Sequence, residues 1–120
     1  MATDDKCCTI APYFKIHTGQ IDAFRDLCTR FVAATSNEPQ CLYYGFSFDG
    51  DQAHCREGYV DAAALLSHAE NVRPLIDEAL TICDLVRIEV HGSEQQLALL
   101  REPLAQFNPQ FFVLEYGFRR

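Results

Sequence analysis

The turn signal Asp49-Gly50-Asp51-Gln52 constrains the fold of this chain more than any other feature. It separates Cys41–Phe48 from Ala53–Val60, two runs rich in strand-forming residues, and such a pattern is typical of a β-hairpin. If Gly50 and Asp51 occupy the centre of the turn, the register follows by counting back along both strands. The predicted facing pairs are Phe48 with Ala53, Phe46 with Cys55, Tyr44 with Glu57, and Leu42 with Tyr59.

A helical pattern and a further strand lie on each side of the hairpin. Cys8–Ile16 is the first strand, and apolar residues at three- and four-residue intervals then predict a helix that Thr18 caps and that runs to about Thr35. Asp61 caps a second helical region, which Pro74 breaks or kinks. Leu85–His91 alternates as the fourth strand. The order βαββαβ predicts an α+β, ferredoxin-like fold with both helices on one face of a sheet.

Two additional elements are expected after this core. A short helix begins at Ser93, and Phe111–Phe118 is a final strand, so residues 93–120 form a C-terminal extension. This extension either closes a pocket entrance or enlarges the sheet. No linker interrupts the sequence, which predicts one domain over residues 1–120 with a flexible start at about residues 1–7.

The two predicted helices leave one face of the sheet uncovered. In the hairpin and in the last strand, aromatic and aliphatic side chains point to both faces of the sheet. In the hairpin, for example, Tyr43 points to one face, and Leu42 and Tyr44 point to the other. A sheet that is apolar on both faces needs a second cover. We expect a homodimer that packs sheet against sheet, and the alternative is that the terminal segment folds over its own sheet.

Composition excludes several classes of partner. The formal net charge is −7 and the ten Lys and Arg residues are scattered, which argues against a nucleic-acid or anionic-membrane partner. No apolar run approaches the roughly 20 residues of a membrane span. The polar N-terminus does not resemble a signal peptide, so the expected location is cytoplasmic. The six cysteines form no Cys-x-x-Cys pair, and neither they nor the four histidines show a metal-ligand spacing, so no metal is expected.

The segment Arg56–His68 resembles the antibiotic biosynthesis monooxygenase (ABM) superfamily at the junction of its third strand and second helix. Glu57, Tyr59, Leu65 and His68 match that pattern residue for residue. The resemblance implies a dimeric α/β barrel with a pocket between helices and sheet in each subunit. It also implies oxidation of a small phenolic or quinol-type compound by molecular oxygen, without a cofactor. The haem-degrading branch is disfavoured, because this chain has no tryptophan and its first strand has no asparagine.

The matched residues and their neighbours define a candidate site. His68 lies on the inward stripe of its helix and is the expected catalytic base toward a phenol or quinol. Tyr59 and Tyr44 are expected to orient a substrate hydroxyl or to stack on an aromatic or quinone-like substrate. Glu57 either holds one histidine tautomer or accepts a hydrogen bond from a tyrosine, and Cys55 lines the pocket. The competing hypothesis is a non-catalytic dimeric module of the same fold that binds a small molecule or is purely structural, with these side chains as core.

Overall fold

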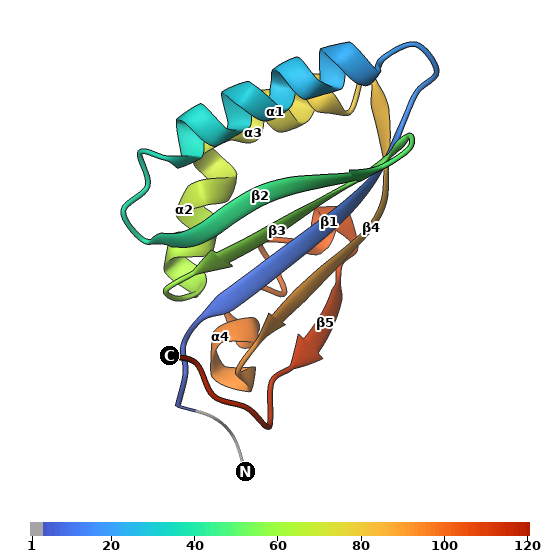
Figure 1. Cartoon of the computed structure of the whole chain (residues 1–120). Helices are drawn as coiled ribbons and strands as arrows, with labels where there is room; N and C mark the ends of the chain where they lie inside the picture. The colour runs from blue at the N-terminus through green and yellow to red at the C-terminus, as the bar shows by residue number, and fades with distance from the viewer. Residues whose placement is uncertain (1–3) are drawn as a thin grey trace.

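A five-stranded sheet in the order β2-β3-β1-β4-β5 forms one layer of the molecule, and helices pack on one of its faces (Figure 1). The structure is a computed structural model that describes residues 4–120. Within that range no helix combines the length and apolarity needed to cross a bilayer. The predicted βαββαβ order and its C-terminal extension are confirmed. The elements are β1 (Cys8–Ile16), α1 (Ile21–Thr35), β2 (Cys41–Asp49), β3 (Gln52–Tyr59), α2 (Ala62–Asn71), α3 (Arg73–Ala79), β4 (Cys83–Gly92), α4 (Glu94–Ala98), the 3-10 turn η1 (Ala105–Phe107) and β5 (Gln110–Val113).

The hairpin of β2 and β3 has the predicted register over most of its length. Phe48 faces Ala53, Phe46 faces Cys55 and Tyr44 faces Glu57. The fourth expected pair, Leu42 with Tyr59, is wrong because the register shifts between Cys41 and Tyr43, and Cys41 faces Tyr59 instead. An extra residue in one strand of an antiparallel pair is a β-bulge, which counting from a turn cannot foresee.

Helix α1 begins two residues later than expected. Gln20, and not Thr18, is its N-cap. The backbone N–H of Gln20 donates to the carbonyl of His17 at 3.0 Å, and Gly19 has a φ of 80°, so residues 17–20 form a tight turn before the helix. The capping preference of threonine is overridden here by the turn that glycine permits.

Proline separates the second helical region into two helices, as predicted. α2 ends at Asn71, and α3 carries Pro74 in its first turn, where the missing backbone N–H costs no helical hydrogen bond. The interior of the domain lies between these helices and the sheet. One cluster of buried residues centres on Phe24, Leu27 and Phe31 of α1, and a second joins α2 to α4 and the segment after it.

The last strand is shorter than expected. β5 covers Gln110–Val113, whereas the sequence pattern predicted Phe111–Phe118. It pairs in parallel with β4, and the final backbone bond runs from the N–H of Leu114 to the carbonyl of Gly92 at 2.7 Å. β4 ends at Gly92, so the residues after Leu114 have no strand beside them and strand propensity alone does not hold them in the sheet.

The two ends of the described chain meet, as Figure 1 shows. Asp5 accepts from the guanidinium of Arg119 at 2.9 Å, and Cys7 is buried. Residues 1–7 or so were expected to be flexible. Of these, residues 1–3 lie outside the described residues, and the contacts of Asp5 and Cys7 hold the segment that follows them against the fold.

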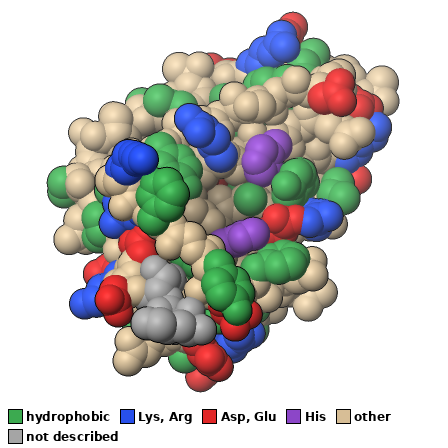
Figure 2. Space-filling view, turned by 60° about the horizontal axis from the view of Figure 1, so that its bottom comes forward, with side chains coloured by type: hydrophobic (Ala, Val, Ile, Leu, Met, Phe, Trp, Pro, Cys, Tyr) green, Lys and Arg blue, Asp and Glu red, His purple; other side chains and the backbone are tan. Residues whose placement is uncertain are grey.

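The face of the sheet opposite the helices is less apolar than expected. Alternation places His54 on that face because its neighbour Cys55 points to the helices, and Tyr13 stacks on His54 with ring centroids 4.4 Å apart. Arg87 lies over the Tyr13 ring and pairs with Glu89. Figure 2, which turns the lower part of the molecule forward, shows hydrophobic side chains separated by basic, acidic and histidine side chains. The second face is therefore aromatic and charged rather than continuously apolar.

We expect Asp61→Ala to lower the free energy of unfolding by about 1 kcal/mol, because the side chain of Asp61 accepts from the backbone N–H of Ala64 at 2.9 Å and caps α2. Urea denaturation of the two proteins measures the difference. Asp61→Asn keeps an acceptor at the same position and serves as the control. An Asp61→Ala midpoint equal to that of the wild type would show that the cap contributes nothing.

Candidate functional site

His68 enters the interior because α2 presents one apolar stripe to the sheet. Leu65, His68 and Val72 recur at three- and four-residue spacing on that stripe, and all three are buried. Helix α2 lies over the end of the sheet formed by β2 and β3 (Figure 1). The imidazole therefore points at the inner face of these two strands.

Strand β3 supplies the residues beneath that imidazole. Cys55, Glu57 and Tyr59 alternate along the strand, so their side chains share its helix-covered face, and all three are buried. Tyr44 of β2 lies opposite Glu57, and its ring centroid is 5.3 Å from that of His68. The structure thus brings together all five residues that were expected from the sequence.

His68 bridges two carboxylates. Its Nε2 is 3.3 Å from Oε1 of Glu57, and its Nδ1 is 2.9 Å from Oε2 of Glu38. Glu57 and His68 are each only 5% exposed. Burial disfavours the charged imidazole, but the two carboxylates together outweigh this effect and raise the pKa of His68 above its ordinary value. The two carboxylates therefore favour the protonated ring over the neutral one.

Glu38 is a member of the site that the sequence did not reveal. It lies in the loop between α1 and β2, thirty positions before His68, within the segment expected only to end the first helix. The amide of Asn71 donates to its Oε2 at 2.8 Å and fixes the carboxylate from α2. A loop residue has no periodicity that predicts its direction, and neither residue type nor spacing marked Glu38.

The other polar groups of the site are neutral donors. Tyr59 donates its hydroxyl to Oε1 of Glu57 at 2.6 Å. Burial, reinforced by the charge of Glu57, raises the pKa of Tyr59, Tyr44 and Cys55 far above neutral. Cys55 is therefore a protonated thiol, because the neighbouring charge of Glu57 disfavours its thiolate, and it is not a nucleophile here.

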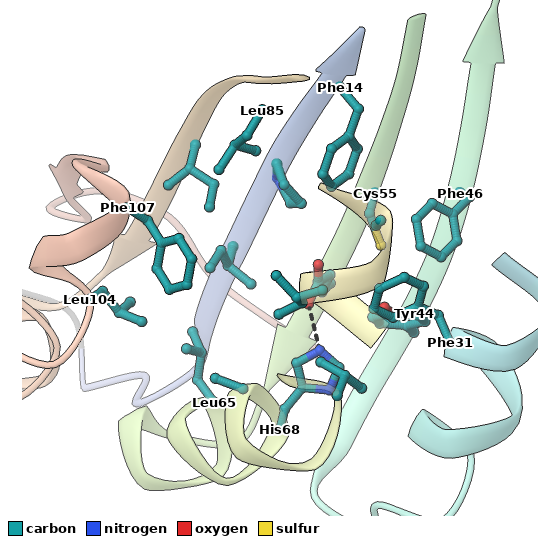
Figure 3. A pocket seen from close by; sticks show the side chains of 18 of the residues that line it. Phe14, Phe31, Tyr44, Phe46, Cys55, Leu65, His68, Leu85, Leu104 and Phe107 are labelled. Atoms are coloured by element: carbon teal, nitrogen blue, oxygen red, sulfur yellow. Dashed lines mark ion pairs between the residues drawn. The ribbon is translucent and has the colours of Figure 1, made fainter. Parts of the chain in front are cut away.

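A cavity of about 80 Å³ opens between the helices and the sheet beside these groups (Figure 3). Tyr44, Cys55, Glu57 and His68 line it, whereas Tyr59 does not and lies behind Glu57. Figure 3 shows His68 pointing from α2 toward the strands, with its ion pair to Glu57 dashed. The volume is well below the 300–1,000 Å³ of ordinary ligand sites. A ligand larger than a small fragment requires side chains of the cavity wall to move.

The remaining cavity wall is almost entirely apolar. The helices contribute Phe31, Val72 and Ile76, and the strands contribute Pro12 and Ile88, among others. In such surroundings water is scarce and each charge acts more strongly than it does in solvent. Within residues 4–120, no group of three or more His, Cys, Asp or Glu side chains is arranged to hold a metal ion.

The C-terminal extension contributes to both the cavity and the sheet. Leu104 and Phe107, from the segment between α4 and β5, line the cavity at the end away from His68, as Figure 3 shows. β5 then adds a strand to the sheet beside β4. The expected enlargement of the sheet is therefore confirmed, and a different part of the segment forms cavity wall.

Similarity to known proteins is found at the level of structure. No family model matches the sequence, and neither does any curated protein. The crystal structure of MupZ from Pseudomonas fluorescens is similar over 96% of this chain and 95% of its own, with 50% sequence identity and a TM-score of 0.92.

Antibiotic biosynthesis monooxygenases are similar at lower identity. One such structure shares 24% identity over 69% of this chain and 92% of its own, with a TM-score of 0.61. A proposed antibiotic biosynthesis monooxygenase from Caulobacter crescentus CB15 shares 17% identity over 72% of this chain and 88% of its own, with a TM-score of 0.64. The chain belongs to the same family as MupZ, and its fold is that of the ABM superfamily.

Proposed function

We propose that this protein is a cofactor-independent, ABM-like monooxygenase in which Glu57 and His68 perform acid–base chemistry on a small phenolic or quinol-type compound. The observation that carries the proposal is a glutamate and a histidine in contact, both 5% exposed, in the wall of an almost entirely apolar cavity. Burying such groups is costly, and it is typical of sites that move protons. The fold of the ABM superfamily is consistent with this chemistry.

Glu57 is the proton acceptor in this proposal. The sequence predicted His68 as the base; we assign the role to Glu57, because each ring nitrogen of His68 faces a carboxylate and these carboxylates raise the pKa of the ring. Glu57 lines the same cavity, and Tyr59 and His68 both contact its Oε1. Its other oxygen, Oε2, takes the substrate proton, and the imidazolium stabilises the oxyanion that remains. Tyr44 orients the substrate hydroxyl.

Dioxygen is the second reactant and the oxidant. Removal of the O–H proton raises electron density on the ring carbons, and one of these carbons forms a bond to an oxygen atom. Cleavage of the O–O bond leaves one oxygen atom on the substrate as a carbonyl, and the other departs as water with two protons. Overall the substrate loses one O–H and one C–H hydrogen, which leave as the two protons of that water, and it supplies the four electrons that reduce dioxygen.

A second candidate function is favoured by the size of the cavity. At about 80 Å³ it is smaller than most ligand sites, and Phe31, Tyr44 and Phe46 occupy the adjoining space. In this alternative the domain is a non-catalytic module, and the ion pairs of His68 stabilise the interior without transferring protons. The two functions differ in whether a ligand reaches Glu57.

Homodimerisation is the third part of the proposal. The sheet face without helices exposes Tyr43, Val86 and Phe112, more apolar surface than a monomer needs there. Arg56, Arg87 and Glu89 on the same face allow a self-complementary charge pattern across a two-fold axis. A sheet-to-sheet dimer is the arrangement that the ABM resemblance implies.

Glu57→Gln is expected to lower catalysed oxygen uptake at least about a hundredfold, since it removes the base but keeps the size of the side chain. Uptake is measured with hydroquinone and with 1,4-naphthohydroquinone, after subtraction of the protein-free rate. His68→Ala is measured in parallel and should also lose activity.

Glu70→Gln is the matched control, because Glu70 is exposed on α2 and does not line the cavity, so the substitution should leave uptake unchanged. Equal uptake by the wild type and Glu57→Gln would remove Glu57 from catalysis. Wild-type uptake that does not exceed the protein-free rate would favour the non-catalytic module.

His68→Gln should destabilise the fold more at low pH than at high pH. The raised pKa means that the ion pairs of His68 contribute fully below its ordinary pKa of about 6.5 and fade as pH rises through the higher pKa of the folded state. We expect a loss of about 3 kcal/mol near pH 6 and a smaller loss near pH 9, from urea unfolding at both pH values. A loss that is independent of pH would mean that His68 is uncharged in the folded protein.

Light scattering at micromolar concentration should give twice the 13.6 kDa mass of one chain. Phe112→Asp places a charge on the exposed sheet face and should shift the protein toward the monomer. Val32→Asp, at an exposed position of α1, is the control and should remain a dimer. A monomeric wild type would contradict sheet pairing.

A further inference from the structure

Glu38 separates the buried acid–base pair from solvent. It lines two shallow depressions on the outer surface, one with Gln40 and Asn71 and one with Thr35 and Tyr43. It does not line the internal cavity, whereas Glu57 and His68 do. A ligand in the cavity therefore meets His68 on its Nε2 side and has no contact with Glu38.

Glu38 makes a specific contact with the imidazole of His68. Both of its carboxylate oxygens lie within hydrogen-bond distance of Nδ1 of His68, at 3.0 and 2.9 Å. Its side chain is 15% exposed, and the amide of Asn71 holds it from one helical turn farther along α2. Asn71 also donates to the carbonyl of Ala34 at the end of α1, so the loop and both helices are tied together at this point.

We propose that Glu38 is a positioning residue, which keeps Nε2 of His68 directed at Glu57 and supplies the counter-charge that the imidazolium needs while Glu57 carries the substrate proton. This inference rests on the proposed acid–base role of Glu57. Glu38 itself does not touch the substrate.

The charge count explains the need for a second carboxylate. In the resting site one imidazolium lies between two carboxylates. When Glu57 accepts a proton it becomes neutral, and with Glu57 as sole partner the imidazolium would then be a buried, uncompensated cation, which is strongly unfavourable. Glu38 keeps one ion pair intact in both states, so Glu57 can change its charge without forcing His68 to change its own.

No other charge faces the imidazole in the described part of the chain. The remaining titratable groups around it are Tyr44 from β2, and Tyr59 and Cys55 from β3. Burial raises the pKa of all three groups, which leaves them neutral through the physiological range. Cys41 lies near Glu38, and its pKa is raised by burial and then by the charge of Glu38, so it is neutral as well.

Nuclear magnetic resonance tests the inference without any substrate. The ring nitrogen shifts of His68 are followed against pH in the wild type and in Glu38→Gln, and the signal is assigned by its loss in His68→Gln. We expect the protonation midpoint to fall in Glu38→Gln, since the substitution keeps the side-chain shape but removes the charge. Glu38→Asp should restore much of the shift.

Two further variants separate this role from general effects. Glu70→Gln removes an exposed carboxylate from α2 close to His68 and should leave the midpoint unchanged. Asn71→Ala keeps every charge but releases Glu38, so a smaller fall is expected even if Glu38→Gln does not fold. An unchanged midpoint in folded Glu38→Gln, or in Asn71→Ala where Glu38→Gln is unfolded, would overturn the inference.

Oxygen uptake by the same variants distinguishes this inference from the proposed function. With an active wild type, Glu38→Gln should lose uptake and shift the pH profile, with little change in KM because Glu38 does not contact the substrate. An inactive wild type whose His68 midpoint still depends on Glu38 would refute the proposed function alone, and would leave Glu38 as the residue that holds the imidazolium.

Discussion

A buried imidazolium must be paired, and this requirement explains the arrangement of the interior. His68 is held between Glu57 and Glu38, which come from β3 and from the loop before β2. With only one of these ion pairs, the charge on His68 would depend on a single carboxylate. In an interior of low dielectric constant, the loss of that carboxylate's charge would leave His68 unpaired, which costs several kcal/mol. Three local features hold these side chains in place: the alternation of side chains along β3, the N-cap of α2 and the amide of Asn71.

Glu57, His68 and Glu38 interact strongly with one another because their surroundings are apolar. One edge of the cavity carries Glu57, His68 and Tyr44, and the rest of its wall consists of aliphatic and aromatic side chains. Leu104 and Phe107 complete that wall from a segment that follows the βαββαβ core. The outer face of the sheet is different, since the cations Arg87 and His91 that pair with Glu89 there are about half exposed to solvent. In our proposal the two faces of one sheet serve different purposes, one for proton chemistry and one for contact with a second copy.

Local patterns predicted the elements well where the backbone alone decides them. Alternation in β3 placed Cys55, Glu57 and Tyr59 on one face, and the hairpin register was correct from its turn as far as the pair Tyr44 and Glu57. The errors occurred where neighbouring segments intervene. The bulge near Cys41 shifted the last pair of the hairpin, and the end of β4 at Gly92 left residues after Leu114 without a partner strand. In both places strand propensity was present, but the pairing that makes a strand was decided elsewhere in the chain.

The sequence by itself determined the order of elements, the inward direction of His68 and the common face of Glu57 and Tyr59, because each depends on a period of two or of 3.6 residues. Only the tertiary structure decided that Glu38 joins them, that Tyr59 stands behind Glu57 rather than in the cavity, and that the pKa of His68 is raised. The protonation of His68 depends on its distance from Glu38, which is thirty positions away in the chain. The volume of the cavity is the small space that large side chains leave unfilled. Neither quantity has a local period, so both appear only when the chain is folded.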